Sequence, residues 1–153
     1  MRLWHYELLP YLPAYQLKGQ YRELIAIMRN WRDKGTPNHL LVNPLMDYPK
    51  TEFMRYFSLY CWYYSFRFGK QVPDSYKIEF VDFCYSENKD NIEHTTFPGE
   101  LFKGWHNKEY LRVCMANLYE KYKFAKGKSK ISEIEWKNLL RGYKTITHEE
   151  YVV

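Results

Sequence analysis

AYQLKGQYRELIAIMRNWRD, residues 14–33, carries the pattern that decides the fold. Apolar side chains recur in this stretch at intervals of three and four residues: Leu17, Tyr21, Leu24, Met28 and Trp31. The spacing follows the period of an α-helix and predicts an amphipathic helix with one buried face. A Lys-Gly-Thr-Pro run at 34–37 then ends the helix.

A second helix is predicted from Pro49 to Phe68, because proline is tolerated in a first turn and Gly69 supplies a C-terminal stop. Eight aromatic residues place rings on nearly every side of it: Phe53, Tyr56, Phe57, Tyr60, Trp62, Tyr63, Tyr64 and Phe66. We therefore expect this helix to be the central one. A stacking surface for bases is the alternative, and core packing is favoured.

Two more helices are predicted in the C-terminal half. Asn107 is a suitable N-cap for a third helix with a regularly spaced buried stripe: Leu111, Cys114, Met115, Leu118 and Tyr122. Ser132 and Glu135 have the spacing of a capping box, which predicts a short fourth helix that ends at Gly142.

The remaining segments lack a helical period. Residues 1–13 contain two prolines, which predicts an extended arm rather than a helix. Residues 70–106 predict a long irregular connection with a short strand or turn near 77–80. The expected fold class is all-α, a compact three- to four-helix single domain over residues 1–153, with a basic C-terminal segment at 126–153.

The net charge of +5 is concentrated at the C-terminal end. From Lys121 to Val153, eight Lys and Arg residues stand against four Glu residues, a net charge of +4. A basic surface attracts phosphate, so nucleic acid is the first partner to consider. A solvated lysine-rich tail is the alternative.

The cysteine pattern and the hydropathy narrow the class of protein. Cys61, Cys84 and Cys114 are far apart and show no zinc-ligand spacing, which predicts reduced core thiols, no metal and no other cofactor. No stretch approaches the roughly 20 apolar residues that a membrane span needs, and the first residues lack the apolar region of a signal peptide. We expect a cytoplasmic protein with no membrane partner.

The polar side of the first helix separates into two strips on a helical wheel. Lys18, Arg22, Arg29 and Arg32 form a basic strip whose spacing can follow a phosphate backbone. Glu23 lies off this strip and off the buried face, beside mostly small neighbours that leave room around its carboxylate. A lone glutamate on a helix is usually solvated or paired with a nearby cation, so the wheel by itself assigns it no function.

Several short motifs lie in one order along roughly residues 1–121: Met1-Arg2-Leu3-Trp4, Gln16-Leu17, Tyr21-Arg22-Glu23-Leu24, Tyr48-x-Lys50-x-Glu52-Phe53, Pro98-x-Glu100, Phe102-Lys103-Gly104 and Ala116-x-Leu118-x-Glu120-Lys121. Together they resemble the pyrimidine-dimer DNA glycosylases, the family of phage endonuclease V. The opening tetrapeptide is similar to the bacterial branch of that family. The match is best at Arg22-Glu23.

The resemblance implies an all-helical domain whose N-terminal arm threads between helices and brings the α-amine of Met1 to the catalytic carboxylate of Glu23. It also implies a DNA glycosylase with abasic-site (AP) lyase activity, which works through an imine on duplex DNA with a damaged base. An α-amine has an ordinary pKa of about 8, against about 10.4 for lysine, so a useful fraction is neutral and nucleophilic. Glu23 would stabilise positive charge at the sugar and move protons.

The same resemblance indicates which cations hold DNA. Arg2 and Arg22 would bind phosphates around the lesion, and Lys121 is retained from the family pattern. Lys18 and Arg29 extend the basic strip of the first helix. We expect the partner to be double-stranded DNA with a damaged base or an abasic site, bound by a monomer at the nucleoid.

Three departures from the family pattern bear on activity. Arg2 is too large for ordinary removal of the initiator, so we expect a retained, deformylated Met1 whose nitrogen still precedes an arginine. Asn117 stands where the family has a basic residue, and Ala26 replaces an arginine whose charge Arg29 could supply. These changes affect the expected lesion specificity more than the expected reaction type.

Two other functions remain open: a basic helical nucleic-acid-binding protein without catalysis, and a family member that is inactive or acts on another base lesion. His5 and His106 could contact phosphate or act as acids, but a structural role is favoured for isolated histidines. The run from Trp136 to Lys144 resembles the aromatic and basic tail with which the family contacts DNA. A plain solvated end is the alternative.

Overall fold

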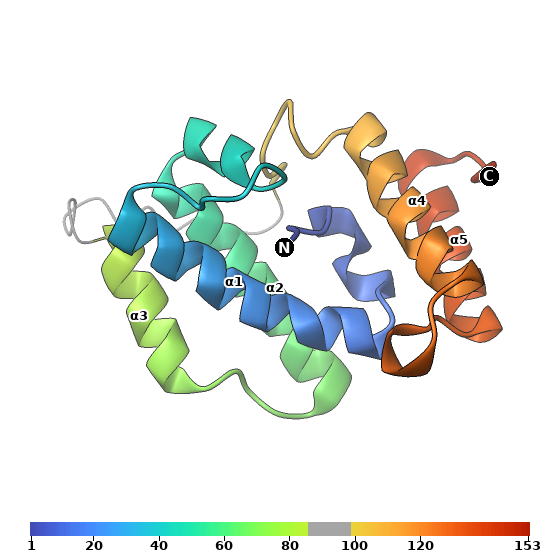
Figure 1. Ribbon diagram of the computed structural model, residues 1–153, viewed down its shortest axis with the longest axis horizontal. Helices are drawn as coiled ribbons and strands as arrows, with labels where there is room; N and C mark the ends of the chain where they lie inside the picture. Colours follow the sequence, from blue (N-terminus) through green and yellow to red (C-terminus); the bar gives the residue numbers. More distant parts are fainter. Residues whose placement is uncertain (86–98) are drawn as a thin grey trace. The chain divides into compact units, whose positions relative to one another are not determined.

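A chain of helices makes up residues 1–85 and 99–153, which are the residues that the computed structural model describes (Figure 1). Within these two ranges there are no β-strands, and the helices follow in this order: η1 (Tyr6–Tyr11), α1 (Ala14–Lys34), η2 (Asn43–Asp47), α2 (Lys50–Phe68), α3 (Asp74–Tyr85), α4 (Lys108–Lys123), η3 (Gly127–Ser129) and α5 (Glu133–Thr147). The elements labelled η are short 3-10 helices. The all-α class is confirmed, whereas the described α-helices exceed the expected three to four.

Helix α1 has the bounds that its apolar period predicts. It runs Ala14–Lys34, and Gly35 follows it with a φ of 76°, in the left-handed region that glycine adopts readily. Leu24 and Met28 on the predicted buried face are fully buried. Ile27, which is not one of the residues of the predicted buried face, is fully buried as well, so the apolar face is wider than predicted.

The described residues form two compact units. The first comprises residues 1–3 and 20–103, and the second comprises residues 4–19 and 104–153. Helix α1 therefore contributes its first turns to the second unit and the rest of its length to the first. Each unit has its own aromatic core, and the single-domain expectation stays a prediction.

Aromatic rings join α1, α2 and α3 in the first unit. Phe57 of α2 stacks on Phe80 of α3 with the ring centroids 3.8 Å apart, and Phe53 meets the same ring edge-on. Trp31 of α1 contacts both Phe53 and Phe83. These rings bury apolar surface between the three helices.

Helix α2 has the predicted bounds, but some of its aromatic rings are buried and others are exposed. It runs Lys50–Phe68, and Gly69 ends it in the left-handed conformation. Tyr56 is fully buried, yet Trp62 and Phe66 are 66% and 82% exposed. Core packing therefore describes one face of this helix, while the rings of Trp62 and Phe66 lie at the surface.

Helix α3 replaces part of the predicted irregular connection. Asp74–Tyr85 is helical where we expected a loop with a strand or turn near 77–80. Its buried residues, Phe80, Phe83 and Cys84, have helical spacing that the polar residues around them obscured. Residues 86–98 of that connection lie outside the described residues, and so does Pro98 of the Pro98-x-Glu100 motif.

The arm in the second unit is a 3-10 helix over Tyr6–Tyr11 rather than an extended segment. A 3-10 turn this short accommodates Pro10, although a long α-helix would not. Two residues of α5 hold the arm. Asn138 Nδ2 donates to the Tyr11 carbonyl at 3.3 Å, and Gly142 lets the Tyr11 ring approach, because a Cβ there would lie 2.4 Å from its Cγ.

The N-caps of α4 and α5 are as predicted, but the C-terminal end of α5 is not. The Asn107 side chain accepts the N–H that caps α4, at 2.9 Å. Ser132 and Glu135 make both bonds of a capping box on α5. Helix α5 continues past Gly142 to a left-handed cap at His148. Gly142 therefore serves the close approach of the arm, and the predicted stop there is wrong.

Candidate active site

The N-terminal amine lies beside the carboxylate of Glu23 in the first unit. The nitrogen of Met1 is 3.9 Å from Glu23 Oε1. The main-chain N–H of Arg2 donates to Glu23 Oε2 at 3.3 Å. Helix α1 presents Glu23 from its middle, so a rigid element supplies the carboxylate while the chain terminus supplies the amine. The structure thus brings together three of the residues singled out from the sequence.

The amine side of this pair faces solvent, and the chain behind it is fixed. Met1 is 36% exposed as a whole residue but only 21% exposed over its side chain, so its main-chain end carries much of the exposure. The Glu23 side chain is 35% exposed. Leu3 is fully buried and anchors the arm two residues after the amine. A substrate can therefore reach both groups.

Gln20 connects the arm, α1 and α2. Its Nε2 donates to the Arg2 carbonyl at 2.8 Å and to Glu23 Oε2 at 3.3 Å. Its Oε1 accepts a hydrogen bond from the Tyr56 hydroxyl at 3.2 Å. Gln20 is 1% exposed and Tyr56 is fully buried. Sequence reasoning missed both residues, and the one available signal was a glutamine a single helical turn before Glu23.

Four residues of the motifs that resemble the family form a cluster, and one of them, Phe102, contacts Tyr56. Phe102 is fully buried, and its ring lies 5.8 Å from that of Tyr56 and 5.3 Å from that of Tyr48. Its φ of 53° is uncommon for a bulky residue, and Glu52 accepts its N–H. The Tyr48 hydroxyl donates to the carbonyl of Lys103 at 2.6 Å. Motifs far apart in sequence therefore support one side of the candidate site.

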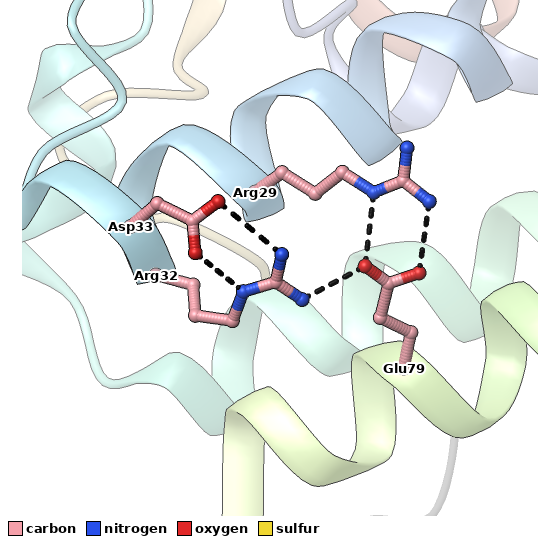
Figure 2. Close-up of polar contacts among 4 residues, drawn as sticks. All are labelled: Arg29, Arg32, Asp33 and Glu79. Carbon is pink, nitrogen blue, oxygen red and sulfur yellow. Dashed lines mark hydrogen bonds and ion pairs between the residues drawn. The ribbon is translucent and has the colours of Figure 1, made fainter.

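Two arginines of the predicted basic strip are held in an ion-pair cluster, which Figure 2 shows. Arg29 donates to both oxygens of Glu79 on α3, at 2.9 and 3.0 Å. Arg32 donates to Glu79 and to Asp33, each at 2.8 Å. The hydrogen bonds from Arg29 lower the pKa of Glu79 from its ordinary value. Two cations and two carboxylates give this cluster no net charge.

The other predicted DNA-binding residues have different surroundings. Arg22 is exposed on α1 and Arg2 is half-buried, and both belong to the first unit. Lys18 is exposed on α1 and Lys121 is half-buried on α4, and both belong to the second unit. Met1, Arg2 and Glu23 are therefore the predicted residues that the structure joins by direct contacts.

The two histidines singled out from the sequence are core residues of the second unit. His5 and His106 are 1% and 4% exposed, and their rings stack with centroids 5.1 Å apart. Nδ1 of His106 accepts the N–H of Tyr6 at 3.1 Å. Burial lowers the pKa of His106 and lowers that of His5 to about 4, so both are neutral at neutral pH. The structural interpretation of these histidines is confirmed.

The aromatic residues of the C-terminal run are buried rather than presented to a ligand. Trp136 and Tyr143 are 6% and 1% exposed. The basic residues between and after them, Lys137, Arg141 and Lys144, are exposed. Only the basic part of this run is therefore available for contact with DNA.

The described residues contain neither a second candidate site built on cysteine or on a metal ion nor a helix that could span a membrane. Cys61, Cys84 and Cys114 are free thiols, and burial raises the pKa of the first to about 11 and of the second to about 12. No group of His, Cys, Asp and Glu in residues 1–85 and 99–153 is arranged to hold a metal ion. No helix among these residues is long and apolar enough to cross a membrane.

The amine, the carboxylate and the residues that connect them all lie in the first part of the chain. Residues 1–65 match the family model for pyrimidine dimer DNA glycosylase. The match includes all of α1 and most of α2, and it is consistent with the family that the motifs indicated. No curated protein and no solved structure matches the chain.

Proposed function

We propose that this protein is a DNA glycosylase with AP-lyase activity, which excises a damaged base, a pyrimidine dimer above all, from duplex DNA. The observation that carries the proposal is the 3.9 Å separation between the Met1 nitrogen and Glu23 Oε1 at an exposed chain terminus. An amine beside a carboxylate suits imine chemistry, because one group supplies the nucleophile and the other exchanges protons.

The first step joins protein and sugar. The uncharged Met1 amine attacks C1′ of the damaged nucleotide, and a nitrogen–C1′ bond forms as the bond from C1′ to the base breaks. The base leaves with the electron pair of that bond and then takes up a proton. Glu23 stabilises the positive charge that develops at the sugar and accepts a proton from the attacking nitrogen.

The second step cuts the strand. The nitrogen lone pair forms a C=N bond as the C1′–O4′ bond breaks, and O4′ takes the proton held by Glu23. The resulting imine acidifies C2′, so the carboxylate can remove a proton there. The electrons move to form a C2′=C3′ bond, and the 3′ phosphate leaves with the electrons of the C3′–O bond. Water then hydrolyses the imine and regenerates the amine.

Exposed and half-buried cations hold the DNA in this proposal. Arg2 follows the attacking amine and Arg22 precedes Glu23, so both can bind phosphates next to the lesion. Lys18 and Lys121, which belong to the second unit, add further phosphate contacts. Arg29 contributes only if its ion pair opens. Turning a nucleotide out of the stack costs a few kcal/mol and is easiest at a poorly stacked lesion.

Borohydride trapping on abasic duplex DNA tests the reaction class. We expect the unmodified protein to form a covalent adduct and to cut the strand, because borohydride reduces the imine to a stable amine. Acetylation of the N-terminus should abolish the adduct. Absence of any adduct with the unmodified protein would favour a basic nucleic-acid-binding protein without catalysis.

Two further measurements test the carboxylate and the lesion. Glu23→Gln keeps the size of the side chain, and we expect it to slow strand cutting by about 100-fold or more. Full cleavage by that variant would remove Glu23 from the mechanism. Cleavage of ultraviolet-irradiated duplexes, set against duplexes with other base lesions, tests the substrate. If the protein excises another base and leaves dimers intact, the proposed reaction stands and the proposed substrate is wrong.

A further inference from the structure

The position of the terminal amine depends on a buried contact between α1 and α2. We propose that Gln20 and Tyr56 act as positioning residues, a hydrogen-bond relay that fixes the main chain of Arg2 against Glu23 and so sets the place of the attacking amine. This inference rests on the proposed function. It assigns a role to two buried polar residues that take no part in the bond-breaking steps.

Both polar groups of the Arg2 main chain are bonded in the first unit. Its N–H donates to Glu23 Oε2, and its carbonyl accepts from Gln20 Nε2. Because the peptide bond between residues 1 and 2 is planar, fixing this amide leaves one main-chain torsion, ψ of Met1, between it and the amine nitrogen. Rotation about that single bond moves the amine toward or away from Glu23 Oε1. The relay therefore reduces the number of conformations that the amine can adopt before it attacks.

The chemistry of the amide group matches its three neighbours. Gln20 directs its NH2 group at two oxygen atoms, the Arg2 carbonyl and Glu23 Oε2, and its own oxygen at the Tyr56 hydroxyl. The reverse orientation would place the amide oxygen against two acceptors, so these neighbours fix the orientation. The i, i+3 spacing of Gln20 and Glu23 puts both side chains on one side of α1.

Burial gives the relay its strength. Gln20 is 1% exposed and Tyr56 is fully buried, so water has little access to replace a lost bond. A buried polar group left without its partner costs more than the net value of an ordinary hydrogen bond. An apolar residue at position 20 would leave the Arg2 carbonyl without this donor, and the arm could then shift away from the helix.

A second buried glutamine on the same helix provides a matched control. Gln16 is 6% exposed, and its Nε2 donates to the main-chain carbonyl of Ser129 in the second unit at 3.1 Å. Gln16→Met and Gln20→Met therefore remove the same chemical group from buried positions one helical turn apart. Only the second substitution removes a contact with Arg2 and Glu23.

The test measures the single-turnover rate of imine formation on an abasic duplex at saturating protein, by borohydride trapping. The dissociation constant is measured in parallel with a duplex that carries an uncleavable tetrahydrofuran analogue. We expect Gln20→Met to lower the rate by about 10- to 100-fold, as the loss of a hydrogen bond to a charged group predicts, with little change in the dissociation constant. Tyr56→Phe keeps the ring and loses only the distal bond, so we expect about a 3- to 10-fold loss.

A double variant separates a relay from a general loss of packing. If Tyr56 acts through Gln20, then adding Tyr56→Phe to Gln20→Met causes no further loss of rate, whereas independent effects multiply. Gln16→Met should lower the melting temperature and leave the rate unchanged. If Gln20→Met does not fold, the rate of Tyr56→Phe alone still tests the proposal.

Each outcome bears on one proposal. A wild-type rate in both Gln20→Met and Tyr56→Phe, or a loss no larger than that of Gln16→Met, would overturn the relay. Multiplying effects in the double variant would overturn it as well. A wild-type protein that forms no adduct would overturn the proposed function instead, before any variant is compared.

Discussion

Two arginines of α1 have different electrostatic surroundings, which predicts that they contribute unequally to DNA binding. Arg22 is exposed one residue before Glu23. Arg29 is held by two hydrogen bonds to Glu79, in a cluster whose charges sum to zero. A phosphate that binds Arg29 must compete with this carboxylate, whereas one that binds Arg22 meets an exposed cation. The perturbations are therefore Arg22→Gln and Arg29→Gln.

The magnitude follows from the release of counterions. Each phosphate contact on duplex DNA contributes about 0.9 to the slope of log affinity against log salt concentration. Arg22→Gln should lower the steepness of that slope by about 0.9, so that between 50 and 200 mM salt the variant loses about 3.5-fold less affinity than the parent. Arg29→Gln should change the slope little. Glu79→Gln should steepen it, because Arg29 and Arg32 then face the DNA with an uncompensated charge.

The assay is fluorescence anisotropy with a labelled duplex that carries an uncleavable abasic-site analogue, titrated at a series of potassium chloride concentrations. The three variants should rank in steepness as Glu79→Gln, Arg29→Gln and Arg22→Gln, from steepest to shallowest. An Arg29→Gln slope as shallow as that of Arg22→Gln would refute the reasoning. It would mean that DNA opens the ion pair and that Arg29 is a phosphate ligand after all.

Other predictions concern the stability of the fold. Gly142→Ala should lower the free energy of unfolding by about 1–3 kcal/mol, because its Cβ would lie 2.4 Å from Cγ of Tyr11. Gly19→Ala, also inside a helix but with nothing within 4 Å of its Cβ, should raise it by up to about 1 kcal/mol, and urea denaturation showing the same sign for both would contradict this account. Burial holds the pKa of His5 at about 4, below the 6.5 of the unfolded chain. Stability should therefore fall by on the order of 3 kcal/mol as pH drops from 6.5 to 4, and an equal fall in His5→Gln would argue against that cause.

The helices that the sequence predicts well are those set by local patterns. The apolar period and Gly35 mark α1, Gly69 marks the end of α2, and the Ser132 capping box marks the start of α5. The predicted end of α5 at Gly142 was wrong, because the sequence alone does not distinguish a glycine inside a helix from a glycine that ends one. Only the packing of the Tyr11 ring distinguishes them, and that contact joins residues far apart in the chain.

The candidate site likewise contains residues that the sequence indicates and residues that only the packing of the helices reveals. The motif around Arg22-Glu23 and the opening residues indicate the amine and the carboxylate, because their residue types and order resemble a known family. Gln20 and Tyr56 were missed because their role depends on how α1 packs against α2. The pairing of Arg29 was missed because its partner lies on α3, a helix that the sequence did not predict.

The central claim is that the α-amine of Met1 is the nucleophile. The most direct test reduces the complex with abasic DNA by borohydride, digests the protein and the DNA, and locates the modified residue by tandem mass spectrometry. This account predicts a sugar remnant on the N-terminal nitrogen of Met1. A remnant on a lysine side chain, with the N-terminal amine unmodified, would contradict it.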